Sequence, residues 1–165
     1  GYAYQSLTRR SPMEHIEYAY THGMDDAQVD ERLRTAQTGV LSLSKNDDAY
    51  AIPVAHFYDG ENLYFRLGST DGSTKRAFLT TTETACYVLY GTEPTADPNE
   101  LESWSVVVTG RLSEVAETEH DRFDTAAINR RFSPIRVFDE PIDDIEITIV
   151  ELEVDTVTGR STVLE

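Results

Sequence analysis

The sequence predicts a mainly β, single-domain protein in which six or seven antiparallel strands close into a barrel with short helices. Apolar residues alternate with a period of two in several segments between Val40 and Val154. Tight-turn sequences such as Asp59-Gly60-Glu61-Asn62 separate neighbouring segments. The regular exchange of strand and helix that is typical of a doubly wound parallel sheet is missing from the sequence, so an antiparallel barrel is the favoured class.

The first half of the chain predicts one helix and a three-stranded meander. Asp25 and Asp26 are suited to cap a helix that runs to about Gln37, with Val29, Leu33 and Ala36 on one face and Gly39 beyond its end. The polar stretch 45–48 predicts a tight turn. The strands are expected at residues 40–44, 49–58 and 63–67.

The second half predicts three further strands and two helices. A Gly-, Ser- and Thr-rich loop is expected at 68–74, followed by a short helix at 75–81, a strand at 84–90, a loop at 91–102, a strand at 103–115 and a helix at 117–129. Ile145, Ile147 and Ile149 alternate in one phase, and Val150, Leu152 and Val154 alternate in the other. This change of phase predicts a β-bulge at 149–150, which would let the last strand bend.

Composition narrows the classes of function. Thirty Asp and Glu against fourteen Lys and Arg give a formal charge of −16, so nucleic acid is an unfavourable partner. The acid is spread along the chain and only two residues are lysines, which indicates the salt-rich cytoplasm of a halophilic archaeon. No stretch is apolar enough to cross a membrane or to act as a signal peptide. We expect residues 1–24 to be an N-terminal extension and 25–165 the domain.

Cysteine and histidine are too sparse to predict a metal centre. Cys86 is the single cysteine and lies in an apolar run, where we expect it to be a small buried residue. His15, His22 and His120 are scattered along the sequence and lack the spacing of metal ligands.

Pro53 interrupts a segment, Tyr50-Ala51-Ile52-Pro53-Val54, that otherwise reads as a central strand. Proline has no N–H to donate to a neighbouring strand. The simpler interpretation is an edge strand. The functional one is that the ladder opens here, so that backbone groups face a flat ligand with several donors and acceptors, such as a flavin ring.

The segment from Gly68 to Arg76 combines features that a phosphate site needs. Glycines, hydroxyl side chains and the start of a helix can supply hydrogen-bond donors, and Lys75 and Arg76, with Arg66 nearby, supply positive charge in an otherwise acidic chain. A solvated helix start is the alternative interpretation of the two adjacent cations.

Together these segments resemble a known family. The order Tyr50-Ala51-Ile52-Pro53-Val54, Phe57-Tyr58-Asp59-Gly60, Leu63-Tyr64-Phe65 and Lys75-Arg76-Ala77 is similar to that of the pyridoxamine 5′-phosphate oxidase-like family of FMN-binding split barrels. The stretch from Glu102 to Arg111 and the turn Val157-Thr158-Gly159-Arg160 resemble two later segments of that family, so the similarity covers about Gly39 to Arg160.

The resemblance implies a cofactor, a partner and a set of contacts. The cofactor would be FMN, and the partner a second copy of the chain, with each flavin at the homodimer interface. Ile52, Pro53 and Val54 would line the ring system, Arg66, Leu67 and Gly68 its edge or ribityl chain, and Ser73, Thr74, Lys75 and Arg76 the phosphate; Ser103 and Trp104 would approach from the partner subunit.

The activity is left open between three alternatives: an FMN-dependent oxidoreductase, which is the leading one, a flavin-binding redox sensor or store, and a reductase of the same fold that uses a deazaflavin. The resemblance is closest to the branch with nitroimidazole reductases, where a histidine often follows the Tyr-Phe pair. Arg66 stands there in this chain, which argues against nitroimidazole reduction. His56 is a candidate proton donor near the flavin, although a hydrogen-bonded histidine inside the barrel is the more frequent case.

Overall fold

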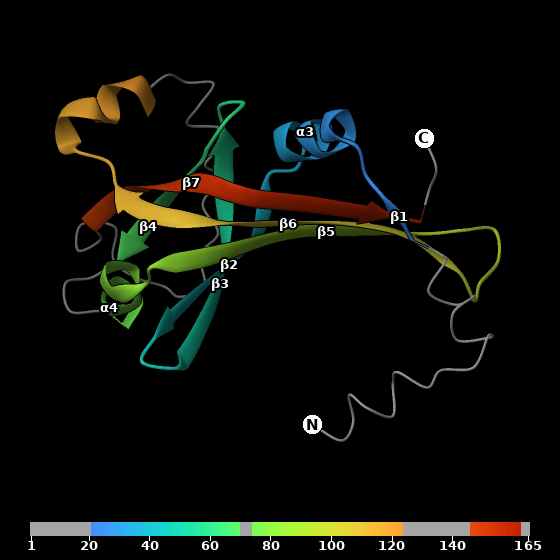
Figure 1. Cartoon of the computed structure of the whole chain (residues 1–165), viewed down its shortest axis with the longest axis horizontal. Helices are drawn as coiled ribbons and strands as arrows, with labels where there is room; N and C mark the ends of the chain where they lie inside the picture. Colours follow the sequence, from blue (N-terminus) through green and yellow to red (C-terminus); the bar gives the residue numbers. More distant parts are fainter. Residues whose placement is uncertain (1–20, 70–73, 124–145, 163–165) are drawn as a thin grey trace.

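The computed structural model describes residues 21–69, 74–123 and 146–162, and in them a barrel of antiparallel strands (Figure 1). The strand order is β1-β7-β4-β3-β2-β5-β6, and β7 also pairs with β6. This last pairing closes a ring of six strands, to which the short β1 (His22–Gly23) adds at the end of β7. The predicted fold class, an antiparallel split barrel with few short helices, is therefore confirmed.

Helix α3 (Asp26–Thr35) begins and ends as its capping residues require. The Asp25 carboxylate accepts a hydrogen bond from the Gln28 backbone N–H, and the Gln28 side chain accepts one from the Asp25 backbone N–H. The buried side chains of Val29 and Leu33 pack into the core. The helix is shorter than predicted because Ala36 is already extended, and Gly39 belongs to the next strand.

The β2–β3 hairpin carries the segment that the sequence singles out. It consists of β2 (Thr38–Lys45) and β3 (Asp48–Tyr58), paired from Thr38↔Ala55 to Lys45↔Asp48. Asn46 and Asp47 both have positive φ, of 48° and 66°, as a two-residue hairpin turn of type I′ requires.

Helix α4 (Thr74–Thr81) packs on this hairpin and follows β4 (Leu63–Ser69) in the chain. The ring of Phe78 stacks on Tyr50 at 5.1 Å between centroids. The Thr82 hydroxyl accepts a hydrogen bond from Ser44 N and lies 3.0 Å from Ser44 O. The helix is thus fixed to the turn end of the hairpin.

The last three strands are long. They are β5 (Thr84–Pro94), β6 (Leu101–Glu114) and β7 (Glu146–Ser161). Half of the segment predicted as a loop at 91–102 is strand, because β5 and β6 pair as far as Pro94↔Leu101. The predicted helix at 117–129 is represented by a 3₁₀ helix, η2 (Glu117–Phe123), and its remainder lies outside the described residues.

The bulge predicted at residues 149–150 is at a different place. Strand β7 pairs with β4 without a shift from Leu63↔Leu152 to Ser69↔Glu146, whereas its register with β6 shifts between Thr109↔Thr156 and Gly110↔Val154. The phase change at 149–150 arises because both residues are buried, on opposite faces of the strand. Val150 belongs to the main core inside the barrel and Ile149 to a second cluster with Tyr64, Val115 and Phe123.

Candidate functional site

The barrel opens between β3 and β4. The two strands pair at three positions only, His56↔Phe65, Phe57↔Tyr64 and Tyr58↔Leu63. Beyond His56, β3 continues along β2, while β4 continues along β7 as far as Ser69↔Glu146. We call the region between residues 51–55 of β3 and 66–69 of β4 the seam. It is where the two strands diverge and where backbone groups of β3 can face a ligand.

Pro53 lies on the seam without weakening the hairpin. His56 N donates to Gln37 O at 3.1 Å, which fixes the hydrogen-bonded positions between the two strands. Because these positions alternate along an antiparallel pair, Val40↔Pro53 falls at a non-hydrogen-bonded position, and the Pro53 nitrogen points away from β2. Proline is therefore tolerated in a strand that is paired on its other side.

The six strand residues predicted to contact the flavin divide between the two faces of the sheet. Ile52, Val54 and Leu67 are 9%, 6% and 3% exposed and belong to the core inside the barrel. Pro53 is exposed, and Arg66 and Gly68 are half-buried on the outer face. Side chains alternate along a strand, so only the second group can present side chains to a ligand outside the barrel. The first group faces the core with its side chains, and the N–H and C=O groups of Ile52 and Val54 are directed at β2.

The predicted phosphate segment joins the end of β4 to the start of α4. Ser73 lies outside the described residues. Thr74, Lys75 and Arg76 form the first turn of α4, and only their backbone is described. The start of this helix follows Ser69, the last residue of β4, by five positions in the sequence, which keeps it within reach of the seam.

Ser103 and Trp104 point to opposite faces of β6. Trp104 packs against the main core, and the Arg32 guanidinium lies over its ring at 4.5 Å from the centroid. A Cβ on Gly91 would overlap the Trp104 indole nitrogen, so glycine is needed opposite the ring. Ser103, on the outer face, is hydrogen-bonded through its backbone to Thr162. Only Ser103 of this pair faces the outside of the barrel.

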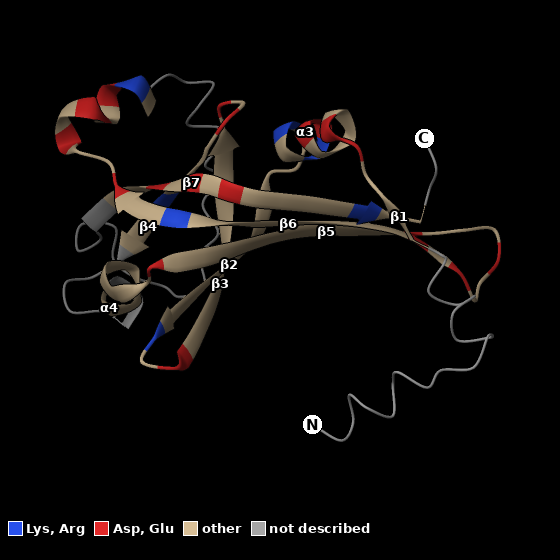
Figure 2. Ribbon diagram, in the orientation of Figure 1, with Lys and Arg blue, Asp and Glu red and all other residues tan. Residues whose placement is uncertain are grey.

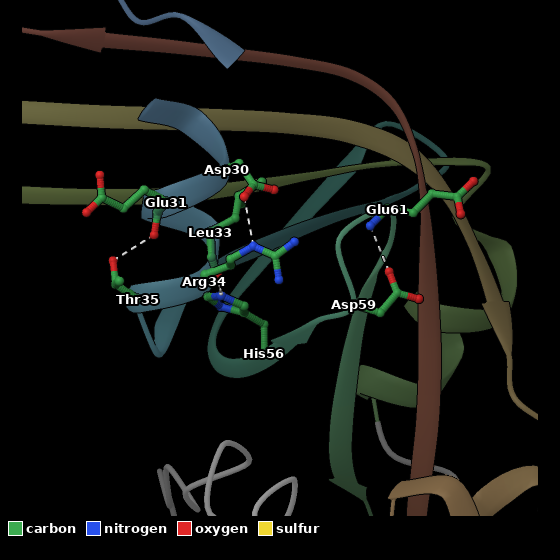
Figure 3. A network of polar contacts seen from close by, with 8 residues as sticks. All are labelled: Asp30, Glu31, Leu33, Arg34, Thr35, His56, Asp59 and Glu61. Atoms are coloured by element: carbon green, nitrogen blue, oxygen red, sulfur yellow. Dashed lines mark hydrogen bonds and ion pairs between the residues drawn. The ribbon is translucent and has the colours of Figure 1, made fainter. Parts of the chain in front are cut away.

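His56 lies inside the barrel and is 2% exposed. Its Nδ1 is 2.7 Å from the Tyr87 hydroxyl and its Nε2 is 2.9 Å from Leu33 O, in the last turn of α3 (Figure 3). The Tyr87 hydroxyl is also 3.2 Å from Val54 O. His56 shares the inner face with Ile52 and Val54, so it does not share the outer face with Pro53 and Arg66.

Two rows of residues on the outer face of the sheet carry no charged side chain, a feature that the sequence analysis missed. Register places two rows of five residues side by side across β3, β2, β5, β6 and β7. We call these rows the neutral face: Pro53, Val40, Val88, Val107 and Thr158 in one, and Ala51, Ser42, Cys86, Thr109 and Thr156 in the other. All ten are exposed or half-buried. Mid-strand β2, β3 and β5 carry no charged colouring in Figure 2.

The neutral face is unusual for this composition. Charged residues make up 27% of the chain, and a solvated surface ordinarily carries about that share or more. Cys86 belongs to this face and is half-buried, so it is not the core residue that the sequence predicted; partial burial raises the pKa of its thiol. The absence of charge at alternate positions of five strands is visible in the sequence only once the strand register is known.

A membrane-spanning helix and a metal site were also sought among the described residues. No helix there is long and apolar enough to cross a membrane. Among the same residues, no three side chains of the His, Cys, Asp and Glu types come close enough together to hold a metal ion.

Solved structures with this fold come from several bacteria. A protein from Bacteroides thetaiotaomicron, provisionally described as a 5-nitroimidazole antibiotic resistance protein, is 17% identical with a TM-score of 0.64, over 86% of this chain and 87% of that one. An FAD-binding protein from Mesorhizobium loti is 15% identical with a TM-score of 0.58, over 86% and 97%. An FAD-binding protein from Mycobacterium smegmatis is 13% identical with a TM-score of 0.58, over 84% and 97%.

A family model gives the assignment. No curated protein sequence matches the chain. The family model described as pyridoxamine 5′-phosphate oxidase matches residues 25–161, which extend from the N-cap of α3 to the last residue of β7. The chain therefore belongs to the pyridoxamine 5′-phosphate oxidase family.

Proposed function

We propose that this protein binds FMN at the seam, as a homodimer, and acts as an FMN-dependent oxidoreductase of a still unidentified substrate. The observation that carries the proposal is the divergence of β3 from β4, with α4 beginning five positions after the end of β4, in a chain that belongs to this family. Two solved structures of the same fold are described as FAD-binding, which supports a flavin without deciding between FMN and FAD.

The residues at the seam fit a flavin. Its ring is flat and has hydrogen-bond donors and acceptors along one edge, and the outward backbone groups of β3 around Pro53 are available to such an edge. Gly68 leaves room for a close approach to β4, and the Arg66 side chain shares its face. An anionic ribityl phosphate needs positive charge, which Lys75 and Arg76 supply at the start of α4.

A second copy of the chain is the partner that fits the neutral face. Two chains of charge −16 repel each other wherever acidic surfaces meet. A two-fold contact brings the same surface of both copies together, so the uncharged side chains of the neutral face would add no charge repulsion there. The face begins at Pro53 on the seam, which would place the flavin at the edge of the contact and Ser103 of each copy near the site of the other.

The division of labour in such a site is simple. When bound, FMN supplies the electron-transfer chemistry. The chain binds the phosphate through the first turn of α4, orients the ring through the backbone of β3, and excludes water from one side of it through the contact between copies. His56 has no direct part in proton transfer in this scheme because its ring lies on the inner face.

Cofactor content decides the first part of the proposal. The protein is purified in high salt, its absorption spectrum is recorded, and the stripped protein is titrated with FMN, FAD and a deazaflavin. We expect a flavin band near 450 nm and tighter binding of FMN than of the other two. A colourless protein that takes up none of the three would overturn the assignment, and preference for the deazaflavin or FAD would replace FMN as the cofactor.

Phosphate recognition is tested with the double variant Lys75→Ala/Arg76→Ala. Loss of two charge-assisted contacts should weaken FMN binding by about 2–4 kcal/mol. Riboflavin, which has no phosphate, serves as the ligand control and should lose little. Lys45→Ala is the matched variant because Lys45 is the other lysine and closes the β2–β3 turn. Equal FMN affinity in wild type and double variant would place the phosphate elsewhere.

Turnover distinguishes the enzyme from a sensor or store. The FMN-loaded protein is reduced with NADH or NADPH and then exposed to oxygen, quinones and nitroaromatic compounds in turn. Repeated reduction and reoxidation with consumption of one acceptor supports an oxidoreductase. Slow, single-cycle reduction with every acceptor supports the sensor or store.

A further inference from the structure

A buried hydrogen-bonded pair links helix α3 to the strand that carries Pro53. His56 reaches Leu33 O in α3 through Nε2 and the Tyr87 hydroxyl of β5 through Nδ1. Tyr87 in turn reaches Val54 O, the carbonyl next to Pro53. Gly39 makes room for this arrangement, since a Cβ there would lie 2.8 Å from the Tyr87 hydroxyl oxygen. These contacts run from α3 through His56 on β3 to Tyr87 on β5, next to the point where β3 and β4 diverge.

The three contacts do not have enough hydrogens when His56 is neutral. Two of them end on backbone carbonyls, which only accept. A bond to Leu33 O therefore takes the hydrogen on Nε2. A bond from Tyr87 to Val54 O, which by register also faces the Gly39 N–H of β2, takes the single hydrogen of the hydroxyl. Burial raises the pKa of Tyr87 well above its ordinary value, so that hydrogen stays on the hydroxyl. The remaining contact, between Nδ1 and the Tyr87 oxygen, then needs a second ring hydrogen.

Two hydrogen-bond arrangements follow from this count, one for neutral His56 and one for protonated His56. With neutral His56, the Tyr87 hydroxyl donates to Nδ1, and the longest contact, 3.2 Å to Val54 O, has no hydrogen. With protonated His56, Nδ1–H donates to the Tyr87 oxygen and the hydroxyl donates to Val54 O. The proton on Nδ1 comes from solvent, and the Tyr87 hydrogen only rotates about its C–O bond.

The helix dipole and burial act in opposite directions on the charge of His56. Leu33 O belongs to the carboxyl end of α3, where the helix dipole favours a cation, while burial of the ring opposes one. The neighbouring arginines of α3 are engaged elsewhere. Arg34 Nε is 2.7 Å from Asp30 Oδ2 (Figure 3), and Arg32 lies over the Trp104 ring. From β4 the residue opposite His56 is Phe65, and from the chain before β2 it is Gln37, both uncharged.

We propose that His56 and Tyr87 are positioning residues for the flavin strand: protonation of His56 transfers the Tyr87 hydrogen bond from His56 to Val54 O and fastens β3 beside Pro53. The proposal rests on the proposed flavin site. A strand held in its binding geometry pays less ordering cost when a ligand binds. Flavin affinity is therefore higher when His56 is protonated, by roughly two- to tenfold, the worth of one such hydrogen bond.

The first experiment needs no flavin. Ring ¹⁵N shifts of His56 and the backbone ¹³C shift of the Val54 carbonyl are recorded by NMR between about pH 5 and 8.5, the range in which imidazoles titrate. We expect the two signals to change together with one midpoint. In Tyr87→Phe the Val54 response should disappear, because no hydroxyl is left to donate. A Val54 shift that is constant in wild type, or that titrates equally in Tyr87→Phe, overturns the proposal.

A second variant covers the case in which Tyr87→Phe does not fold. In His56→Gln the amide can accept from Tyr87 and donate to Leu33 O without ever carrying charge, so the chain stays in the neutral arrangement at every pH. The Val54 shift should then match the high-pH value of wild type throughout. His120→Gln is the control, because His120 contacts Val115 O near η2 instead; it should leave the Val54 titration unchanged.

Flavin binding closes the test. The ratio of FMN dissociation constants at pH 8.5 and pH 5.5 is compared between wild type and His56→Gln, which cancels the titration of the FMN phosphate itself. A ratio two- to tenfold larger in wild type supports positioning, and equal ratios overturn it. If no variant, wild type included, binds any flavin, the proposed function fails, while the NMR experiment still decides whether the pair switches.

Discussion

The two halves of the barrel are held together very differently. Strands β5 and β6 pair without a break from Thr84↔Arg111 to Pro94↔Leu101, and β6 pairs with β7 over a similar length. The β2–β3 hairpin is joined to the rest at three positions with β4 and three with β5. The long ladders form the scaffold, while the hairpin depends on a few specific contacts at its edges.

The sparse pairing of the hairpin determines where a ligand site can form. A fully paired strand has its backbone hydrogen bonds committed on both sides, whereas a strand that leaves its neighbour offers backbone groups to a ligand. The hairpin still keeps a defined position because side chains replace the missing pairs: Phe78 and Thr82 hold its turn end, and His56 with Tyr87 holds its other end. These contacts therefore fix the position of β3 at the seam.

The largest effect is expected from a change in the scaffold. A Cβ on Gly110, next to the bulge, would overlap the backbone oxygen of Glu153 and force β6 and β7 apart. Gly110→Ala should lower the free energy of unfolding by about 2–4 kcal/mol, measured by urea denaturation at fixed salt. Gly23→Ala is the matched control, because a Cβ there meets nothing within 4 Å. Equal stabilities would show that the long ladders tolerate local separation.

A charged substitution on the neutral face should weaken association of two copies and leave the stability of the fold nearly unchanged. Val88 is half-buried at the centre of one row, between Val40 and Val107. Val88→Glu would place two carboxylates in a two-fold contact and should raise the dimer dissociation constant about a hundredfold. Light scattering across a concentration series measures it, with Val88→Thr as the uncharged control. A dimer that Val88→Glu leaves intact would use another surface.

The turn between β3 and β4 should show a smaller, pH-dependent effect. Burial alone would raise the pKa of Asp59, but hydrogen bonds from the backbone of Asn62 and Glu61 and from the Tyr64 hydroxyl outweigh it and hold the pKa below its ordinary value. A lowered pKa adds stability that is complete above the unfolded pKa of about 4 and is lost as the pH falls through the folded value.

Asp59→Asn should therefore destabilise the protein at pH 7 by about 1 kcal/mol, a figure kept small because the carboxylate is partly solvated. The difference from wild type should shrink as the pH falls from 5 towards 3. Urea titrations at several pH values measure it, and Glu61→Gln, two positions further along the same turn, is the control. A difference that stays constant with pH would mean that Asp59 acts by shape and not by charge.

Local signals in the sequence predicted the local structure well. The capping pair Asp25 and Gln28 starts α3, and the two turns of the meander lie where their residues place them. The seam and the neutral face could not be read directly because both depend on register between strands that are distant in sequence. The misplaced bulge has the same origin: Ile149 is buried by residues of a second cluster, which an alternation rule for one strand does not include.

Prediction of the candidate site residues had the same limit. The sequence drew attention to Pro53 and to the start of α4, where composition is locally unusual; Pro53 lies on the seam, and the start of α4 follows the last residue of β4 by five positions. It could not separate Ser103 from Trp104, or Pro53 from Ile52 and Val54, because residue type does not reveal which face of the sheet a residue occupies. The partners of His56 lie 23 and 31 residues away from it, beyond any local pattern.

The smallest effect concerns Pro53 itself and tests the geometry of the seam most sharply. Because its nitrogen points away from β2, Pro53→Ala removes no ladder bond and restores none. Stability should fall by only about 0.5 kcal/mol, through greater freedom of the unfolded chain. At Ile52, whose N–H points towards β2, Ile52→Pro should cost far more than Ile52→Ala, since proline also removes a hydrogen bond to Leu41. Urea denaturation of the four proteins measures both contrasts. A large loss in Pro53→Ala together with a tolerated Ile52→Pro would mean that the hydrogen-bonded positions are reversed, and the outward backbone groups of the seam would then belong to Ile52 and Val54.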